Sequence, residues 1–104
     1  MMRRRVPYIE TKTGSLDLGA TTTVSWDFTP ANTMIVSVDK AASGNGADIA
    51  IEDVRLDGTS VGTSFTSADW PELPVVWRVD VDVKNNSGTS AENYAIELKA
   101  LRYI

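Results

Sequence analysis

The side chains that most often perform chemistry in proteins are missing from this chain. It has no histidine and no cysteine among its 104 residues. Histidine is the usual general base near neutral pH and the commonest transition-metal ligand, and thiolate chemistry needs cysteine. The composition therefore excludes Ser-His-Asp, Cys-His and histidine-metal mechanisms, and also disulfide bonds. Carboxylates, a Ser-Lys pair or a metal held by oxygen ligands are left, and we expect neither enzymatic activity nor a cofactor.

Two aspartates have the spacing of a catalytic pair. Asp80 and Asp82 fall on one face of an alternating segment, about 7 Å apart at the rise of a strand. That separation suits several two-carboxylate mechanisms. Any acidic, solvent-facing strand presents the same spacing, however, and Arg78 and Lys84 flank the pair here. We interpret the two aspartates as part of a solvated strand face.

Oxygen ligands for calcium are available but not grouped. The candidates are Asp48, Asp53, Asp57 and Asp69, and none forms the Asp-x-Asp-x-Asp-Gly spacing of a calcium loop. The Gly44-Asn45-Gly46 segment lacks the glycine spacing and the following Lys-Ser/Thr of a nucleotide loop. The sequence predicts no metal site and no phosphate site.

Three tryptophans suggest stacking on sugar rings or on a protein partner. Trp26 and Trp77 keep the phase of their apolar neighbours, which predicts that both lie in the core. Trp70 lies in residues 67–74, where two prolines indicate an extended loop outside any ladder. Its indole either covers the end of the domain or is an exposed contact, and we take Trp70 as a candidate partner-binding residue.

A basic cluster, Arg3, Arg4 and Arg5, stands at the N-terminus of an acidic chain. The formal net charge is −4, and removing these three arginines lowers it to −7. Residues 1–7 are expected to form an arm, either a solvated tail or a contact to an acidic surface of a neighbouring subunit. The acidic remainder makes nucleic acid an unexpected partner. No stretch has the length of a signal peptide or a membrane span, so we expect a soluble product of the cytoplasm.

Residues 75–84 carry the clearest structural signal. Val75, Trp77, Val79, Val81 and Val83 alternate with polar residues, which predicts one strand buried on one side. A turn-rich stretch over 85–90 and a second alternating segment over 93–102 follow. We expect these two segments to pair as an antiparallel hairpin.

Earlier segments repeat the strand pattern between turn signals. Strands are expected over 24–28, 34–40 and 61–66, over 49–56 with a β-bulge between Ile51 and Val54, and over the shorter 7–12 and 16–18. Asp57-Gly58 and the loop 41–46 supply turns. The sequence thus predicts an all-β domain over 8–104: a single antiparallel β-sandwich of seven to eight strands, either jelly-roll or immunoglobulin-like.

Two segments resemble known sandwich families. Residues 79–98, with alternating valines, Asn86-Ser87-Gly88 and a returning apolar strand, resemble the hairpin of immunoglobulin-like adhesion modules of the CARDB type. Residues 54–59, Val-Arg-Leu-Asp-Gly-Thr, resemble jelly-roll carbohydrate-binding modules. Both resemblances imply a sandwich, and neither carries over a functional residue.

A small β-sandwich without an export signal also resembles the accessory structural proteins of tailed bacterial or archaeal viruses, such as decoration, tail or fibre-attachment proteins. That resemblance implies a non-enzymatic protein of the virion, assembled in the host cytoplasm, that docks on a capsid or tail and contacts copies of itself or other virion proteins. Its expected partner-binding residues are Arg3, Arg4, Arg5 and Trp70. The alternative is a module that binds a carbohydrate or another surface ligand.

Overall fold

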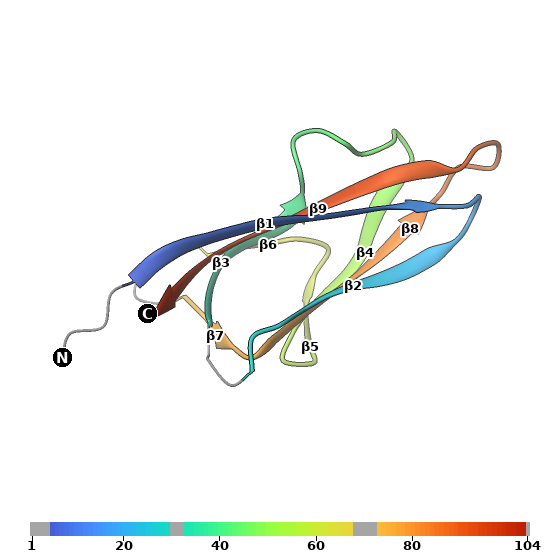
Figure 1. The fold of residues 1–104 in the computed structure, drawn as a ribbon. Helices are drawn as coiled ribbons and strands as arrows, with labels where there is room; N and C mark the ends of the chain where they lie inside the picture. The colour runs from blue at the N-terminus through green and yellow to red at the C-terminus, as the bar shows by residue number, and fades with distance from the viewer. Residues whose placement is uncertain (1–4, 30–32, 68–72, 104) are drawn as a thin grey trace.

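The computed structural model describes residues 5–29, 33–67 and 73–103. These residues form two antiparallel β-sheets packed face to face (Figure 1). The strands are β1 (Arg5–Leu16), β2 (Thr21–Asp27), β3 (Thr33–Lys40), β4 (Ile49–Leu56), β5 (Thr59–Gly62), β6 (Phe65–Thr66), β7 (Val75–Val76), β8 (Arg78–Asn85) and β9 (Glu92–Tyr103). No apolar helix of bilayer-spanning length occurs in these three ranges. The predicted all-β sandwich is confirmed.

The strand order distinguishes between the two predicted architectures. One sheet has the order β1-β9-β3-β6, with β7 also paired to β3, and the other has the order β2-β8-β4-β5. Successive strands β1 to β4 therefore alternate between the sheets. Apart from the two-residue β7, this is the eight-stranded arrangement of a jelly roll. In an immunoglobulin fold the first two strands would share a sheet.

The core lies between the two inner faces. Alternate residues of β8 and β9 supply its centre, because a strand directs every second side chain to the same side. Val79, Val81 and Val83 from β8 and Ile96 and Leu98 from β9 are fully buried. In β4, the four predicted core residues are all buried, and the register with β8 shifts between Ile51 and Asp53. The predicted bulge is confirmed.

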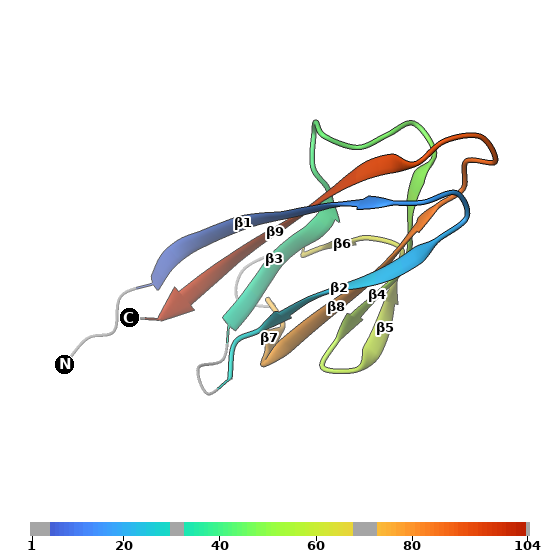
Figure 2. The same ribbon diagram turned by 45° about the vertical axis from the view of Figure 1, so that its right-hand side comes forward.

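The expected hairpin of 75–84 with 93–102 is wrong. β8 pairs with β2 and β4, whereas β9 pairs with β1 and β3, so the segment between β8 and β9 crosses from one sheet to the other (Figure 2). The fully buried Asn85 holds this crossing: its amide donates to the carbonyls of Leu16 (3.1 Å) and Ser90 (3.0 Å), and its oxygen accepts from the N–H of Ser87 (2.8 Å). Alternation identifies strands, but it does not identify their sheet.

The expected continuous strand 75–84 is also wrong, because it is interrupted at Trp77. β7 belongs to one sheet and β8 to the other, and Trp77 occupies the bend between them. The bend shifts the alternation by one residue. Val76 is therefore in the core, whereas Val75 is 52% exposed and Trp77 is 46% exposed.

At the N-terminus, one long strand replaces the two short strands expected over 7–12 and 16–18. β1 pairs with β9 without interruption from Arg5, opposite Tyr103, to Leu16, opposite Glu92. Arg5, Val6 and Pro7, assigned to the expected arm, are part of this strand. Position 14, within this strand, is a glycine, and a Cβ there would collide with the phenol ring of Tyr94 on β9.

Candidate binding surfaces

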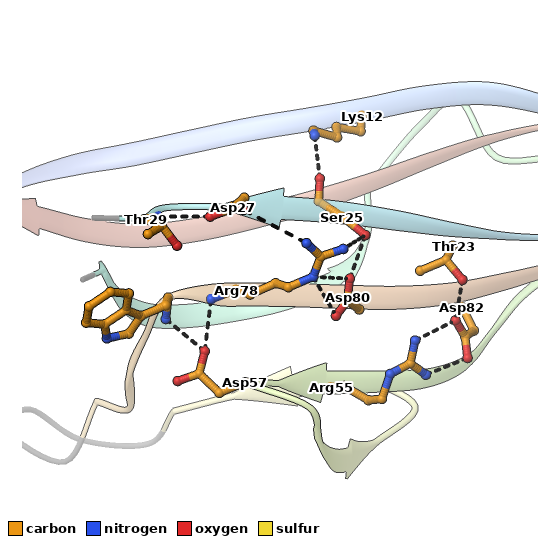
Figure 3. Close-up of polar contacts among 11 residues, drawn as sticks. Lys12, Thr23, Ser25, Asp27, Thr29, Arg55, Asp57, Arg78, Asp80 and Asp82 are labelled. Carbon is orange, nitrogen blue, oxygen red and sulfur yellow. Dashed lines mark hydrogen bonds and ion pairs between the residues drawn. The ribbon is translucent and has the colours of Figure 1, made fainter. Parts of the chain in front are cut away.

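The outer face of the β2-β8-β4-β5 sheet carries a network of charged and hydroxyl side chains (Figure 3). Asp82 accepts hydrogen bonds from both terminal nitrogens of Arg55 on the neighbouring strand β4, at 2.6 and 2.9 Å. Thr23 on β2 donates to the same carboxylate at 2.7 Å. Arg55 also contacts Asp53 at 3.0 Å. Three strands are thus linked through one aspartate and one arginine.

Asp80 is the centre of a second set of contacts on this face. Its carboxylate accepts from the hydroxyl of Ser25 at 2.6 Å and from Nε of Arg78 at 3.0 and 3.1 Å. Arg78 also lies 3.9 Å from Asp27 at the end of β2. Asp80 and Asp82 do share one face, as predicted, but each is bound by its own arginine.

These contacts favour the ionised carboxylates. Hydrogen bonds from Arg55 and Thr23 lower the pKa of Asp82, and hydrogen bonds from Ser60 and Arg55 lower the pKa of Asp53. Partial burial acts to raise the pKa of Asp80, but the contacts with Ser25 and Arg78 outweigh it and the pKa is lowered. A general acid needs the opposite shift, toward the operating pH. The arrangement fits an ion-paired sheet face.

Two of the four calcium candidates, Asp53 and Asp57, have carboxylates that accept hydrogen bonds from other groups of the chain. Asp53 binds Arg55 and Ser60, and Asp57 accepts from backbone N–H groups. The backbone N–H of Asp48 donates to a carboxylate oxygen of Glu92 at 2.8 Å, and Asp69 lies outside the described residues. Within the described ranges, no three acidic side chains gather as a metal site would require.

The two tryptophans that were predicted to lie in the core differ in burial. Trp26 is buried as expected, and the ammonium group of Lys12 lies 5.2 Å from its ring centre. Trp77 was expected in the core but is at the surface, because the chain changes sheets at this residue. Trp70, the predicted contact residue, lies outside the described residues.

Hydrogen bonds hold the backbone at Trp77 in place. One carboxylate oxygen of Asp57 accepts from the N–H of Trp77 at 2.8 Å and from the N–H of Arg78 at 2.9 Å. The Trp77 carbonyl accepts from the N–H of Phe28 at 2.7 Å. Asp57 itself has φ 50°, in the two-residue Asp57-Gly58 turn between β4 and β5. An exposed indole is therefore carried on a rigid bend.

Of the four residues predicted to bind a partner, only Arg5 lies within the described residues. It is exposed at the start of β1, while Arg3, Arg4 and Trp70 fall outside. The sequence did not identify the acidic surface that the arm was expected to contact, and Asp80 and Asp82 of β8 already have arginine partners from their own chain.

A feature that the sequence interpretation missed crosses the outer face of the other sheet. Pro7 on β1 pairs with Leu101 on β9, Leu101 pairs with Met34 on β3, and Met34 pairs with Val75 on β7. Paired residues share a face, so these four form one apolar row across the sheet. Ile9, two residues after Pro7 on the same face, is 62% exposed. We call Pro7, Ile9, Leu101 and Val75 the apolar strip; Met34, within the row, is buried.

The sequence pattern could have predicted part of the strip, namely that Leu101 faces outward. In residues 93–102 the inward residues include Leu98 and Ala100, so Leu101 falls on the outward side. An apolar residue in an outward position is the signal. Its alignment with Pro7 and Val75 depends on pairing between strands distant in the sequence, which no local pattern contains.

The edge of the same sheet is less suited to pairing than its face. Edge strand β1 contains Pro7, and it turns the charged side chains of Glu10 and Lys12 inward. Lys12 donates to the Ser25 carbonyl on β2 at 2.5 Å, across the side of the sandwich. Proline and inward charges are features by which natural sheets prevent edge-to-edge association.

Comparison of the chain with family models, curated proteins and solved structures finds no match. The resemblances drawn from the sequence therefore remain predictions.

Proposed function

We propose that this chain is a non-catalytic structural domain that acts by assembly, as a small jelly-roll protein of a virion that docks on a capsid or tail and contacts neighbouring subunits. The observation that carries the proposal is the contrast between the two outer faces. The β2-β8-β4-β5 face pairs its charges with one another, whereas the opposite face presents the apolar strip to solvent.

The exposure of the strip supports a contact function. Single apolar residues are common on protein surfaces, but this row exposes hydrocarbon at both of its ends, at Pro7 and Ile9 on β1 and at Val75 on β7. Between the two ends, Leu101 is half-buried and Met34 is buried. Burying such a group against a partner stabilises the complex by roughly 25 cal/mol for each Å² removed from water. The protection of β1 as an edge also favours docking through the face.

The proposed role in a virion is tested by asking whether the protein is present in purified virus particles. Particles purified on a density gradient from cultures of the source organism are analysed by quantitative mass spectrometry. We expect the chain in a fixed ratio to the major shell or tail protein. A chain found only in the fraction that does not sediment, with particles present, would remove the virion role.

Carbohydrate binding is the second candidate, and the exposed Trp77 on its rigid bend favours it. An indole face can stack on a sugar ring, and rigid support reduces the entropy lost on binding. The test is a glycan array with the wild type and with Trp77→Ala. Binding that disappears in the variant supports this candidate, and a wild type that binds no glycan removes it.

A further inference from the structure

We propose that Asn45-Gly46 is a spontaneous deamidation site that the folded chain keeps unreactive, and that modification of Asn45 releases the loop 41–46 from β9. The inference is independent of the proposed assembly function. The pair lies in the connection between β3 and β4, which runs beside the start of β9 (Figure 1). It is the only Asn-Gly pair in the sequence.

Asparagine followed by glycine is reactive because glycine has no side chain to hinder its own backbone nitrogen. In the reaction, the Gly46 nitrogen forms a bond to the side-chain carbon Cγ of Asn45, which gives a cyclic imide. The bond from Cγ to Nδ2 breaks, and Nδ2 leaves as ammonia with the proton that the Gly46 nitrogen gives up. Water then opens the imide at either of its carbonyls, which leaves aspartate or isoaspartate at position 45.

Hydrogen bonds hold both reacting groups in the folded chain. The leaving group, Nδ2 of Asn45, donates to the carbonyls of Ala95 at 2.9 Å and Ala41 at 3.2 Å. Oδ1 of Asn45 accepts from the N–H of Ala95 at 2.8 Å, so the amide pairs with β9 as a neighbouring strand would. The attacking group, the Gly46 N–H, donates to the carbonyl of Asn93 at 2.9 Å. Attack on Cγ therefore requires the loop to separate from β9 first.

These hydrogen bonds, and not the exclusion of water, provide the protection. Asn45 and Gly46 are only half-buried, and they border a hollow of about 470 Å³ that Ser90 and Glu92 also line. Solvent can reach the loop and supply the base and the water that the reaction needs. The rate should then follow the local opening of the loop, which is less costly than unfolding of the whole domain.

Packing against β9 explains why a reactive pair occurs at this place. A Cβ at Gly46 would lie 2.7 Å from the Cβ of Glu92, closer than two such atoms approach, so the position requires glycine. Position 45 requires a side chain that both donates to Ala95 and accepts from it, which an amide does. The structure thus needs the two residues whose combination is reactive.

Deamidation should weaken the attachment of the loop. An aspartate at position 45 has no N–H to offer the carbonyls of Ala41 and Ala95, and its second carboxylate oxygen faces them with like charge. Isoaspartate also lengthens the main chain at this point. Either product adds a negative charge, and the change is irreversible.

Peptide mapping at mildly alkaline pH tests the protection. The tryptic peptide 41–55 contains Asn45 as its only asparagine, so its mass reports the reaction. Deamidation of the folded wild type should be roughly tenfold or more slower than that of the same chain unfolded in guanidinium chloride. Because attack needs a free Gly46 N–H, the slowing should be no smaller than the protection of this amide from hydrogen exchange. Equal rates in the folded and unfolded chains would overturn the inference.

Gly44→Ala should loosen the loop without changing the reacting pair. Gly44 has φ 93°, and a Cβ there would lie 3.1 Å from that of Ala95. The variant should deamidate severalfold faster than the wild type when folded and at the wild-type rate when unfolded. Gly88→Ala is the matched control, because a Cβ at Gly88 meets no neighbouring atom, and it should change neither rate. Equal rates in the two folded variants would contradict protection by the loop.

Asn45→Asp tests the consequence of the modification. Hydrogen exchange at the N–H groups of Ala41 and Gly46, both bonded to β9, should be at least several-fold faster than in the wild type. Ser43→Asp is the control, because it adds the same charge to the same loop at an exposed position, and it should leave both exchange rates nearly unchanged. Wild-type exchange in Asn45→Asp, or equal acceleration in both variants, would overturn the release of the loop through lost amide hydrogen bonds.

Discussion

The Asp57 carboxylate accepts a hydrogen bond from the backbone N–H of Trp77, 20 residues later in the sequence, at 2.8 Å. This hydrogen bond joins the β4-β5 turn to the bend at which the chain changes sheets. The same oxygen also accepts a hydrogen bond from the backbone N–H of Arg78. Asp57 can approach both groups because it adopts a left-handed φ of 50°, which aspartate and asparagine tolerate better than most residues. One turn residue thus positions an exposed indole.

Asp57 offers a direct test of this relationship. Asp57→Ala removes the acceptor and places a less tolerant residue at positive φ, so the free energy of unfolding should fall by about 1–3 kcal/mol. Asp57→Asn keeps a side-chain oxygen acceptor and the tolerance of this φ, and it should lose less than half as much. Urea unfolding measures both. Equal losses in the two variants would show that the hydrogen bonds to Trp77 and Arg78 are not what Asp57 contributes.

The buried Asn85 should be among the polar residues most important for stability. Asn85→Ala leaves the carbonyls of Leu16 and Ser90 and the N–H of Ser87 without their partner, and we expect a loss of about 3 kcal/mol. Asn86→Ala is the matched control, because the Asn86 side chain is exposed, and it should change stability by about 0.5 kcal/mol or less. Similar losses in both variants would contradict the role assigned to Asn85.

Gly14 should be coupled to Tyr94. Gly14→Ala places a methyl group where the Tyr94 phenol lies, and the free energy of unfolding should fall by about 1–3 kcal/mol. In a Tyr94→Ala background the same substitution should cost much less, because the ring is gone. A double-mutant cycle measures this coupling energy. A cost of Gly14→Ala that is the same in both backgrounds would rule out the ring as its cause.

Acid should weaken the ion-paired face in a defined pH window. The pKa values of Asp27, Asp53, Asp80 and Asp82 are lower in the folded chain than the ordinary value of an aspartate, so their contribution to stability is present above the unfolded pKa. It is lost as the pH falls through the lower folded values, since the unfolded chain then binds more protons. Urea midpoints should therefore drop from pH 5 toward pH 2.5. Asp82→Asn should have a shallower slope over this window, and an unchanged slope would contradict the shift assigned to Asp82.

Local patterns predicted the strands well and their partners poorly. The alternation in β2, β4 and β9 reports which side of each strand faces apolar surroundings, and it also indicated the bulge after Ile51. Two strands with the same alternation can lie in one sheet or face each other across the core, since both arrangements bury the same residues. The β8 and β9 segments are such a case, and the expected hairpin was wrong for this reason.

For the candidate surfaces, too, the sequence predicted which residues lie on a polar face but not their partners. That Asp80 and Asp82 lie on a polar face was readable from the neighbouring Arg78, but the main partner of Asp82 is Arg55, 27 residues away. Trp77 was misplaced because its phase matches that of Val79, and only the bend between two sheets separates them.

By itself, the sequence determined that this protein is an all-β domain without histidine or thiol chemistry, because composition and period-two alternation are local properties of the chain. The tertiary structure alone decided the jelly-roll order, the exposure of Trp77 and the alignment of Pro7, Leu101 and Val75. These features depend on which distant strands share backbone hydrogen bonds, and every backbone offers the same donors and acceptors whatever its side chains.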